Sequence, residues 1–232
     1  DAALATAIAL TVLEPTGNGL GSDAFAILWD GQELHGLNAS GVAPAAWNAQ
    51  RFAGRVEMPF RGWESVTVPG AVSAWVALSK RFGALPFADL FVPAIRYAED
   101  GFAVSPVIAA LWARAAEQLG DQPGFAETFL PDGRAPRAGE RFRAPGHART
   151  LRAIAQTQGR AFYEGEIAEA IAAFATKHDA ALSLADLANH RPEWCGTIST
   201  AFDDATLHEI LGTGHGADGD ARTCRGVGRA AG

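Results

Sequence analysis

The glycine-rich segment Glu14–Phe25, with the sequence EPTGNGLGSDAF, follows an apolar helical pattern and precedes two short apolar runs. The alanine-rich residues 2–13 predict a mostly buried helix that ends before Pro15, because proline disfavours helical conformation in the residue before it. A phosphate-binding glycine loop requires a strand before it and a helix after it. Here the order is reversed, which argues against a nucleotide site. A tight helix-to-strand connection and a pocket wall formed by close backbone approach remain as alternatives.

A β-hairpin is predicted directly after this loop. Two apolar runs between residues 24 and 38 are joined at Asp30-Gly31, a dipeptide that suits a tight turn. From Asn38 to Pro69 the chain carries prolines and aromatic residues without a regular period, so we expect a folded loop there.

The middle of the chain carries repeated start and stop signals for helices. Ser105 and Pro106 begin one pattern, and Gly120 ends it. A fresh helix is expected at Pro93, within the second range below. The helical patterns cover residues 71–83, 86–101, 105–120, 146–159, 164–178 and 183–190. Residues 129–145 read as a solvated, turn-rich connection, and 194–200 and 205–210 as strands.

This order of elements fits neither a regular βαβ repeat nor an all-β fold, and it indicates an α/β domain. With 232 residues, 48% of them hydrophobic, the chain can bury one sizeable core. Its net charge of -7 argues against nucleic acid or an anionic membrane surface as a partner. The apolar run Ala2–Leu13 is too short to span a bilayer, and no other spanning segment is predicted.

No motif in the sequence by itself defines a catalytic, metal or cofactor site. The six histidines lack metal-binding spacing, and Cys195 and Cys224 suggest neither a disulfide framework nor a zinc site. The segment Gly214–Asp220 matches a single calcium-binding repeat, which by itself cannot complete a site. There is no GxSxG motif and no evident Ser-His-Asp triad. From the residues alone the function stays open.

Several stretches in order resemble the γ-glutamyltransferase family. They include DAALATAIALTVLEP with GLGSDAF, the helical segment VPGAVSAWVALSKRFGALPFADLFVPAIRYAEDGFAVSP, and AFYEGEIAEAIA, LADLANHRPEW and ISTAFDDATLHEI. The resemblance implies an N-terminal nucleophile hydrolase, an αββα sandwich made as a precursor and cut into a large and a small subunit. Residues 1–210 then form an incomplete, large-subunit portion, and the small subunit is the expected partner.

The resemblance implies acyl transfer from glutathione or a related small-molecule amide, without a cofactor. The nucleophile is a threonine that begins the small subunit, so no catalytic residue is expected in this chain. GTGH at 212–215 is similar to that start but lies too early. The alternative is a catalytically inactive fragment or pseudoenzyme with at most a binding role.

Both ends of the chain depart from the family pattern. Residues 211–232 are about one-third glycine, and we expect this tail to be disordered or out of frame. The chain opens inside a helical pattern without Met, so the natural N-terminus is expected to be missing and the compartment stays undetermined. Alone, the chain should expose apolar strand edges and aggregate.

The resemblance also points to four substrate-binding residues: Ser22, Asp23, Asn38 and Ser40. Family members specific for γ-glutamyl groups carry an arginine for the substrate carboxylate where LNASGVAP places Ser40; the alternative is a plain turn residue. Ser22, Asp23 and Ala24 replace glycines that are common in the family. A charge-assisted contact contributes about 1.5–3 kcal/mol, so its loss should weaken such substrates roughly ten- to a hundredfold. We therefore expect an acylase-like member, similar to cephalosporin acylases, with another acyl donor.

Overall fold

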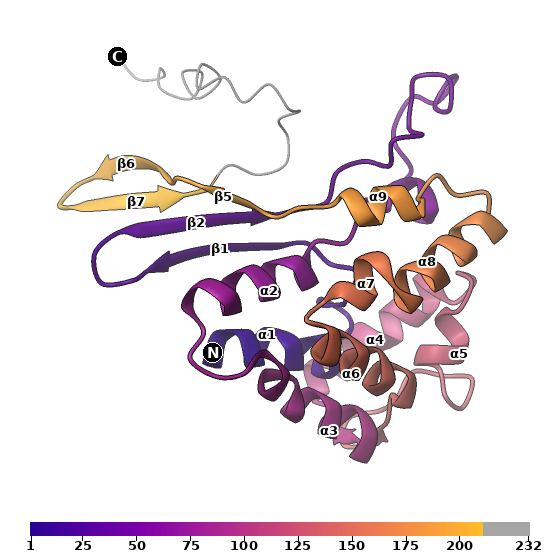
Figure 1. Cartoon of the computed structure of the whole chain (residues 1–232). Helices are drawn as coiled ribbons and strands as arrows, with labels where there is room; N and C mark the ends of the chain where they lie inside the picture. Colours follow the sequence, from indigo (N-terminus) through magenta and orange to yellow (C-terminus); the bar gives the residue numbers. More distant parts are fainter. Residues whose placement is uncertain (211–232) are drawn as a thin grey trace. The chain divides into compact units, whose positions relative to one another are not determined.

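The computed structural model describes residues 1–210, which fall into two compact units (Figure 1). Unit 1 consists of Asp1–Ala24 and Ala39–Pro192, and unit 2 of Phe25–Asn38 with the described residues from Glu193 onward. The expectations for the tail 211–232, including GTGH, the glycine-aspartate segment and Cys224, concern residues outside the described part.

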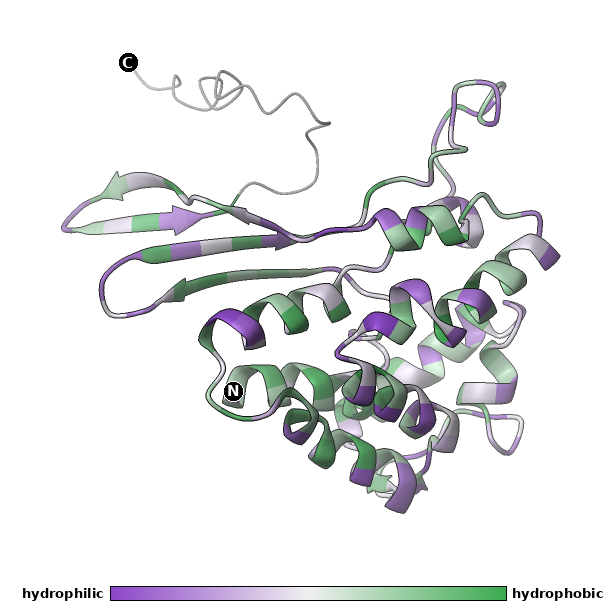
Figure 2. Cartoon of the chain, viewed as in Figure 1, coloured by the Kyte–Doolittle hydropathy of each residue, from purple (hydrophilic) through white to green (hydrophobic). Residues whose placement is uncertain are grey.

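Unit 1 is mainly helical. Its longer helices are α1 (Ala2–Leu13), α2 (Ala71–Phe82), α3 (Val92–Asp100), α4 (Pro106–Leu119), α6 (Pro145–Thr157) and α8 (Glu166–Lys177). Its shorter elements are α5 (Phe125–Phe129), α7 (Arg160–Glu164), α9 (Leu184–Asn189), the 3-10 turns η1 (Trp63–Ser65) and η2 (Phe87–Phe91), and the paired strands β3 (Phe102–Ala103) and β4 (Arg141–Phe142). Most of α1 is hydrophobic in Figure 2, and Ile8 from this helix lies in the main core with Phe91, Trp112 and Leu151.

The predicted helix boundaries are largely confirmed because capping signals are local. The Ser105 hydroxyl accepts from the Ile108 backbone N–H at 3.3 Å, and Pro106 occupies the first helical position of α4. At α9, Ser183 and Asp186 form a reciprocal capping box. The sequence prediction missed α5 and α7 as separate helices, and it missed β4 inside the predicted connection 129–145.

Unit 2 contains two small sheets. Strands β1 (Ala24–Trp29), β2 (Leu34–Ala39) and β5 (Glu193–Cys195) form one in the order β1-β2-β5, and β6 (Ile198–Phe202) pairs with β7 (Ala205–Glu209). In the antiparallel β2–β5 ladder, Gly36 lies opposite Cys195. A Cβ atom on Gly36 would lie 2.9 Å from the Cys195 carbonyl oxygen, so glycine permits this approach.

The predicted hairpin is confirmed, and its turn is tight, because the Asp30 N–H donates to the Glu33 carbonyl at 3.3 Å across residues 31 and 32. Residues 30–33 join β1 to β2, and Gly31 has a φ of 102°. The Asp30 Oδ1 atom accepts from the backbone N–H groups of Gln32 at 2.8 Å and Glu33 at 2.9 Å. The aspartate therefore closes the turn with its side chain.

Strand β1 exposes every second side chain, and all three are large and apolar. Phe25, Ile27 and Trp29 keep 48%, 42% and 61% of their surface accessible, and the strand is hydrophobic along its length in Figure 2. Such a face normally marks a contact with another chain or segment. Among the described residues, no helix has the length and apolar character required to cross a bilayer.

Candidate functional site

The predicted residues Ser22 and Asp23 link the glycine loop to two other segments of unit 1. The Asp23 Oδ1 atom accepts from the Gly41 backbone N–H at 2.8 Å, which places Asp23 beside the backbone that follows Ser40. The Ser22 carbonyl accepts from the N–H groups of Gly70 at 3.1 Å and Ala71 at 2.8 Å. The structure thus brings Ser22, Asp23 and Ser40 into one neighbourhood.

Two glycines outside the loop make the closest backbone approach. A Cβ atom on Gly41 would lie 1.6 Å from the Val68 carbonyl oxygen, and one on Gly70 would lie 1.7 Å from that of Ala39. No side chain fits at either position. In the loop itself, Gly17 and Gly21 have open space around them. The loop glycines therefore form a connection, and the backbone packing expected of them occurs instead between residues 39–42 and 68–70.

The N-terminus of α2 is capped by groups distant in the sequence. Its N-cap residue Gly70 offers no side chain. The Tyr163 hydroxyl accepts from the Ser73 N–H at 3.0 Å and donates to the Pro69 carbonyl at 2.9 Å. Together with the Ser22 carbonyl on Ala71, it satisfies N–H groups that a helix start leaves unpaired. The glycine loop and Tyr163 thereby fix where α2 begins.

A buried Ser73–His190 contact lies behind this helix start. The Ser73 hydroxyl donates to the Gly70 carbonyl at 2.7 Å and lies 3.0 Å from His190 Nε2, which then donates to it. Ser73 and His190 are 8% and 5% exposed, and the His190 ring stacks on Tyr163 with centroids 5.4 Å apart. Sequence reasoning missed this pair, since no motif joins residues so far apart. Because the Ser73 proton is already donated to a carbonyl and the pair is closed to solvent, its role is structural.

The buried groups behind Asp23 are neutral at pH 7. Burial lowers the pKa of His190, against the opposing effect of the Asp23 carboxylate. Burial also raises the pKa of Tyr163 to about 12, although hydrogen bonds to Ser73 lower it in part. Asp23 acts on both groups, so its carboxylate lies close to a buried neutral cluster.

The four predicted residues differ in exposure. Ser40 follows β2 and is 9% exposed, so it is a buried residue and not an open turn residue. Asn38 lies within β2 opposite Glu193 and is half-buried, as is Ser22. Asp23 is exposed. Their contact with a substrate stays a prediction.

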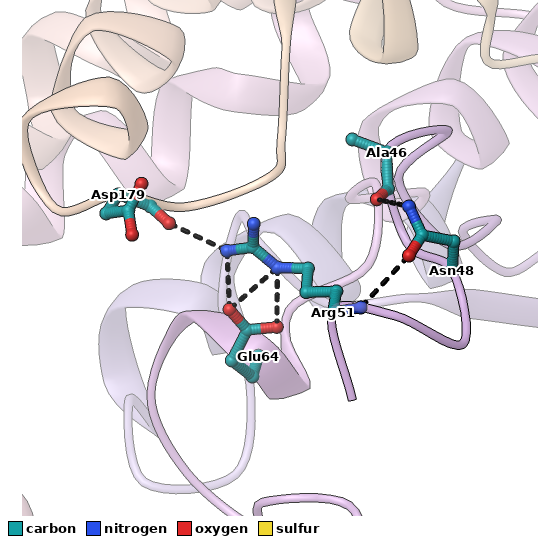
Figure 3. Close-up of polar contacts among 5 residues, drawn as sticks. All are labelled: Ala46, Asn48, Arg51, Glu64 and Asp179. Carbon is teal, nitrogen blue, oxygen red and sulfur yellow. Dashed lines mark hydrogen bonds and ion pairs between the residues drawn. The ribbon is translucent and has the colours of Figure 1, made fainter. Parts of the chain in front are cut away.

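The irregular segment between β2 and α2 is a folded loop, as predicted, and one ion pair closes part of it (Figure 3). Arg51 Nη2 lies 2.6 Å from Glu64 Oε1, and Arg51 Nε donates to both carboxylate oxygens at 3.0 and 3.1 Å. The same Nη2 atom donates to the Asp179 carbonyl at 2.7 Å. Arg51 also holds the pKa of Glu64 below its usual range. This cluster anchors the loop to the segment after α8.

One group of side chains in unit 2 has the composition of a metal site. Within residues 1–210, ligand atoms of Asp30, Glu33 and His35 lie within 4.8 Å of one another. His35 Nε2 is 2.8 Å from Asp30 Oδ2, and this hydrogen bond, with the turn N–H groups, holds the pKa of Asp30 well below its usual range. Both Asp30 oxygens already accept hydrogen bonds within the hairpin, Oδ1 from the turn N–H groups and Oδ2 from His35. These residues therefore close the turn, and their geometry is not that of an open metal site.

Comparison with known proteins gives consistent matches along the chain. A family model described as gamma-glutamyltranspeptidase matches residues 1–217. The chain is 38% identical over 220 residues to the oxamate amidohydrolase proenzyme of Klebsiella pneumoniae, covering 90% of this chain and 41% of that protein. It is 33% identical over 223 residues to the glutathione hydrolase-like YwrD proenzyme of Bacillus subtilis, covering 94% and 42%. It therefore spans about two fifths of the length of these relatives.

Solved structures match in fold as well. A cephalosporin acylase from Bacillus halodurans superimposes with a TM-score of 0.86 at 48% identity, covering 91% of this chain and 41% of that one. The gamma-glutamyltranspeptidase from Pseudomonas nitroreducens superimposes with a TM-score of 0.84 at 27% identity, covering 91% and 63%. The fold class expected from the sequence is confirmed by these neighbours.

Proposed function

Because the chain belongs to the γ-glutamyltranspeptidase family, we propose that it is the large-subunit part of a precursor that becomes an acyltransferase or amidohydrolase. The observation that carries this is the extent of the match: the family model covers residues 1–217, and the relatives at 38% and 33% identity are proenzymes. The missing partner is the small subunit of the same precursor. The exposed apolar face of β1 supports such a partner.

The proposed chemistry is acyl transfer through an ester. A threonine hydroxyl at the start of the small subunit attacks the amide carbonyl of the donor, and its own α-amine takes the proton. Backbone N–H groups stabilise the oxyanion as the tetrahedral intermediate forms. The C–N bond breaks, the amine leaves with a proton, and water or an acceptor amine releases the acyl group. This chain supplies part of the pocket wall and no nucleophile.

Ser22, Asp23, Asn38 and Ser40 form that wall in our proposal, and the acyl donor is not an ordinary γ-glutamyl group. Ser40 stands where the family arginine for the donor carboxylate is expected, so the positive charge of that arginine is absent at this position. The loss of such a contact weakens a carboxylate-bearing donor roughly ten- to a hundredfold. The 48% identical cephalosporin acylase and the oxamate amidohydrolase relative support a donor of another type.

The test is expression of the gene that contains this chain, continued downstream of codon 210. We expect a precursor that cuts itself into two subunits, seen by gel and mass spectrometry, and that hydrolyses a non-γ-glutamyl anilide faster than glutathione or a γ-glutamyl anilide. A precursor with alanine at the first residue of its small subunit should stay uncut and inactive. A reading frame without the threonine start would contradict the proposal and favour the inactive fragment. Ordinary turnover of glutathione would contradict the donor assignment.

A further inference from the structure

Asp23 places a carboxylate beside the backbone that follows Ser40, and within residues 1–210 this carboxylate forms no ion pair. Its Oδ1 atom accepts from the Gly41 N–H at 2.8 Å, and the residue is exposed. Its Oδ2 atom makes no hydrogen bond or ion pair to any residue within 1–210. One oxygen therefore holds the side chain in place, and the other has no hydrogen-bond partner among the described residues.

No positively charged side chain within residues 1–210 forms an ion pair with Asp23. His190 and Tyr163, the titratable groups that sense Asp23, are buried and neutral at pH 7. The Arg191 guanidinium, which also acts on His190, keeps its positive charge but donates to the carbonyls of Ala188 and His190 at 2.7 and 2.6 Å. Within residues 1–210, Asp23 therefore carries a carboxylate that no ion pair neutralises.

The position of the carboxylate is set by the backbone around it. Residue 22, directly before it, accepts from the N–H groups of Gly70 and Ala71. Gly41, its hydrogen-bond partner, is held against Val68, whose N–H donates to the Val42 carbonyl at 3.1 Å. A charge held in this way needs no reorganisation when a ligand approaches, so it discriminates more sharply than a mobile surface charge.

We propose that Asp23 selects the acyl donor by charge, favouring donors whose far end carries an amine and disfavouring donors that carry a carboxylate there. This inference rests on the proposed function, since it needs the assembled pocket. Asp23 repels a donor carboxylate, and this repulsion acts together with the loss of the arginine that would attract it. Specific sites commonly combine attraction of one ligand with repulsion of another. One unit charge acting over several ångströms near a protein surface changes binding by about fivefold to tenfold.

The experiment uses the complete, self-cleaved enzyme and three p-nitroanilides with the same five-carbon chain: 5-aminopentanoyl, pentanoyl and glutaryl. We expect kcat/KM to fall in that order. Asp23→Asn keeps an oxygen that can accept from Gly41 and removes only the charge. It should raise kcat/KM for the glutaryl anilide by about fivefold to tenfold, lower it similarly for the aminopentanoyl anilide, and leave the pentanoyl anilide almost unchanged. Both shifts should shrink in 1 M salt, which screens charges.

Two further variants keep the inference falsifiable. Asp23→Glu retains the charge and should retain the order of the three donors, while Glu127→Gln removes an exposed charge from α5 and should change none of the rates. Equal loss for all three donors in Asp23→Asn would mean that Asp23 only supports the fold, and it would overturn the inference while the proposed function stands. Absence of hydrolysis for all three donors and for glutathione would overturn both.

Discussion

The hydroxyl of Tyr163 offers a direct test of how α2 is fixed. Tyr163→Phe removes one oxygen that donates to the Pro69 carbonyl and accepts from the Ser73 N–H. The ring can stay in place, since Phe has the same shape. What remains is one backbone donor and one backbone acceptor in a largely buried position without their partner.

The expected cost follows from those two unpaired groups. A buried polar group left unsatisfied costs about 1–3 kcal/mol. Two of them, with partial relief from entering water, give a loss of about 2–4 kcal/mol in the free energy of unfolding. For a chain of this length, 1 kcal/mol corresponds to about 2–4 °C, so Tm should fall by roughly 5–15 °C.

The assay is thermal and urea unfolding, followed by circular dichroism at protein concentrations below the onset of association. The chain has two tyrosines, and the other one, Tyr97, is 43% exposed. Tyr97→Phe is therefore the matched control, with an expected change within about 0.5 kcal/mol. If the free energy of unfolding of Tyr163→Phe lies within that margin of the control, the hydroxyl does not hold the start of α2 and the reasoning is refuted.

Three further results are expected from the same chain. The pKa of Tyr163 is raised to about 12 from an ordinary 10.0. The contribution of this group to the free energy of unfolding is therefore full below pH 10 and falls as pH rises toward 12. In Tyr97→Phe, phenolate absorbance should appear only near pH 12, and titration near pH 10 would contradict this. Gly41→Ala should prevent folding, because its Cβ would lie 1.6 Å from the Val68 carbonyl oxygen, whereas Gly21→Ala has open space and should fold normally. Equal solubility and equal circular dichroism spectra for the two variants would argue against close backbone packing between residues 39–42 and 68–70. The isolated chain should self-associate in light-scattering measurements and Trp29→Gln should reduce this, so a wild-type chain that stays monomeric at all concentrations would speak against a shared core.

Sequence reasoning succeeded where the signal is local. Ser105, Pro106 and Gly120 bound α4 because a cap acts within one turn of its own helix. The Asp30-Gly31 pair marked the hairpin for the same reason, and the side chain of Asp30 closes the turn. Such features need no knowledge of the rest of the fold.

It failed where two distant segments meet. The sequence shows many glycines, but only the fold reveals that Gly41 and Gly70, and not those of the loop, press against backbone. The Ser73–His190 contact likewise joins elements with no shared motif. The four candidate substrate residues came from resemblance alone. Of these, the structure shows for Asp23 a hydrogen bond from Gly41 and an exposed position.

Because Gly36 of β2 pairs with Cys195 of β5, β2 can pair with β5 only after the ribosome has made a segment much later in the chain. At about 5–20 residues per second, β2 emerges from the ribosome roughly ten to thirty seconds before β5 is made. During that interval the edge of β2 has no strand to pair with, while Trp29 and its neighbours on β1 are already exposed. Neighbouring nascent chains on one messenger carry the same open edge. The yield of folded chain should therefore depend on translation rate and on ribosome spacing, even when the finished sheet is stable.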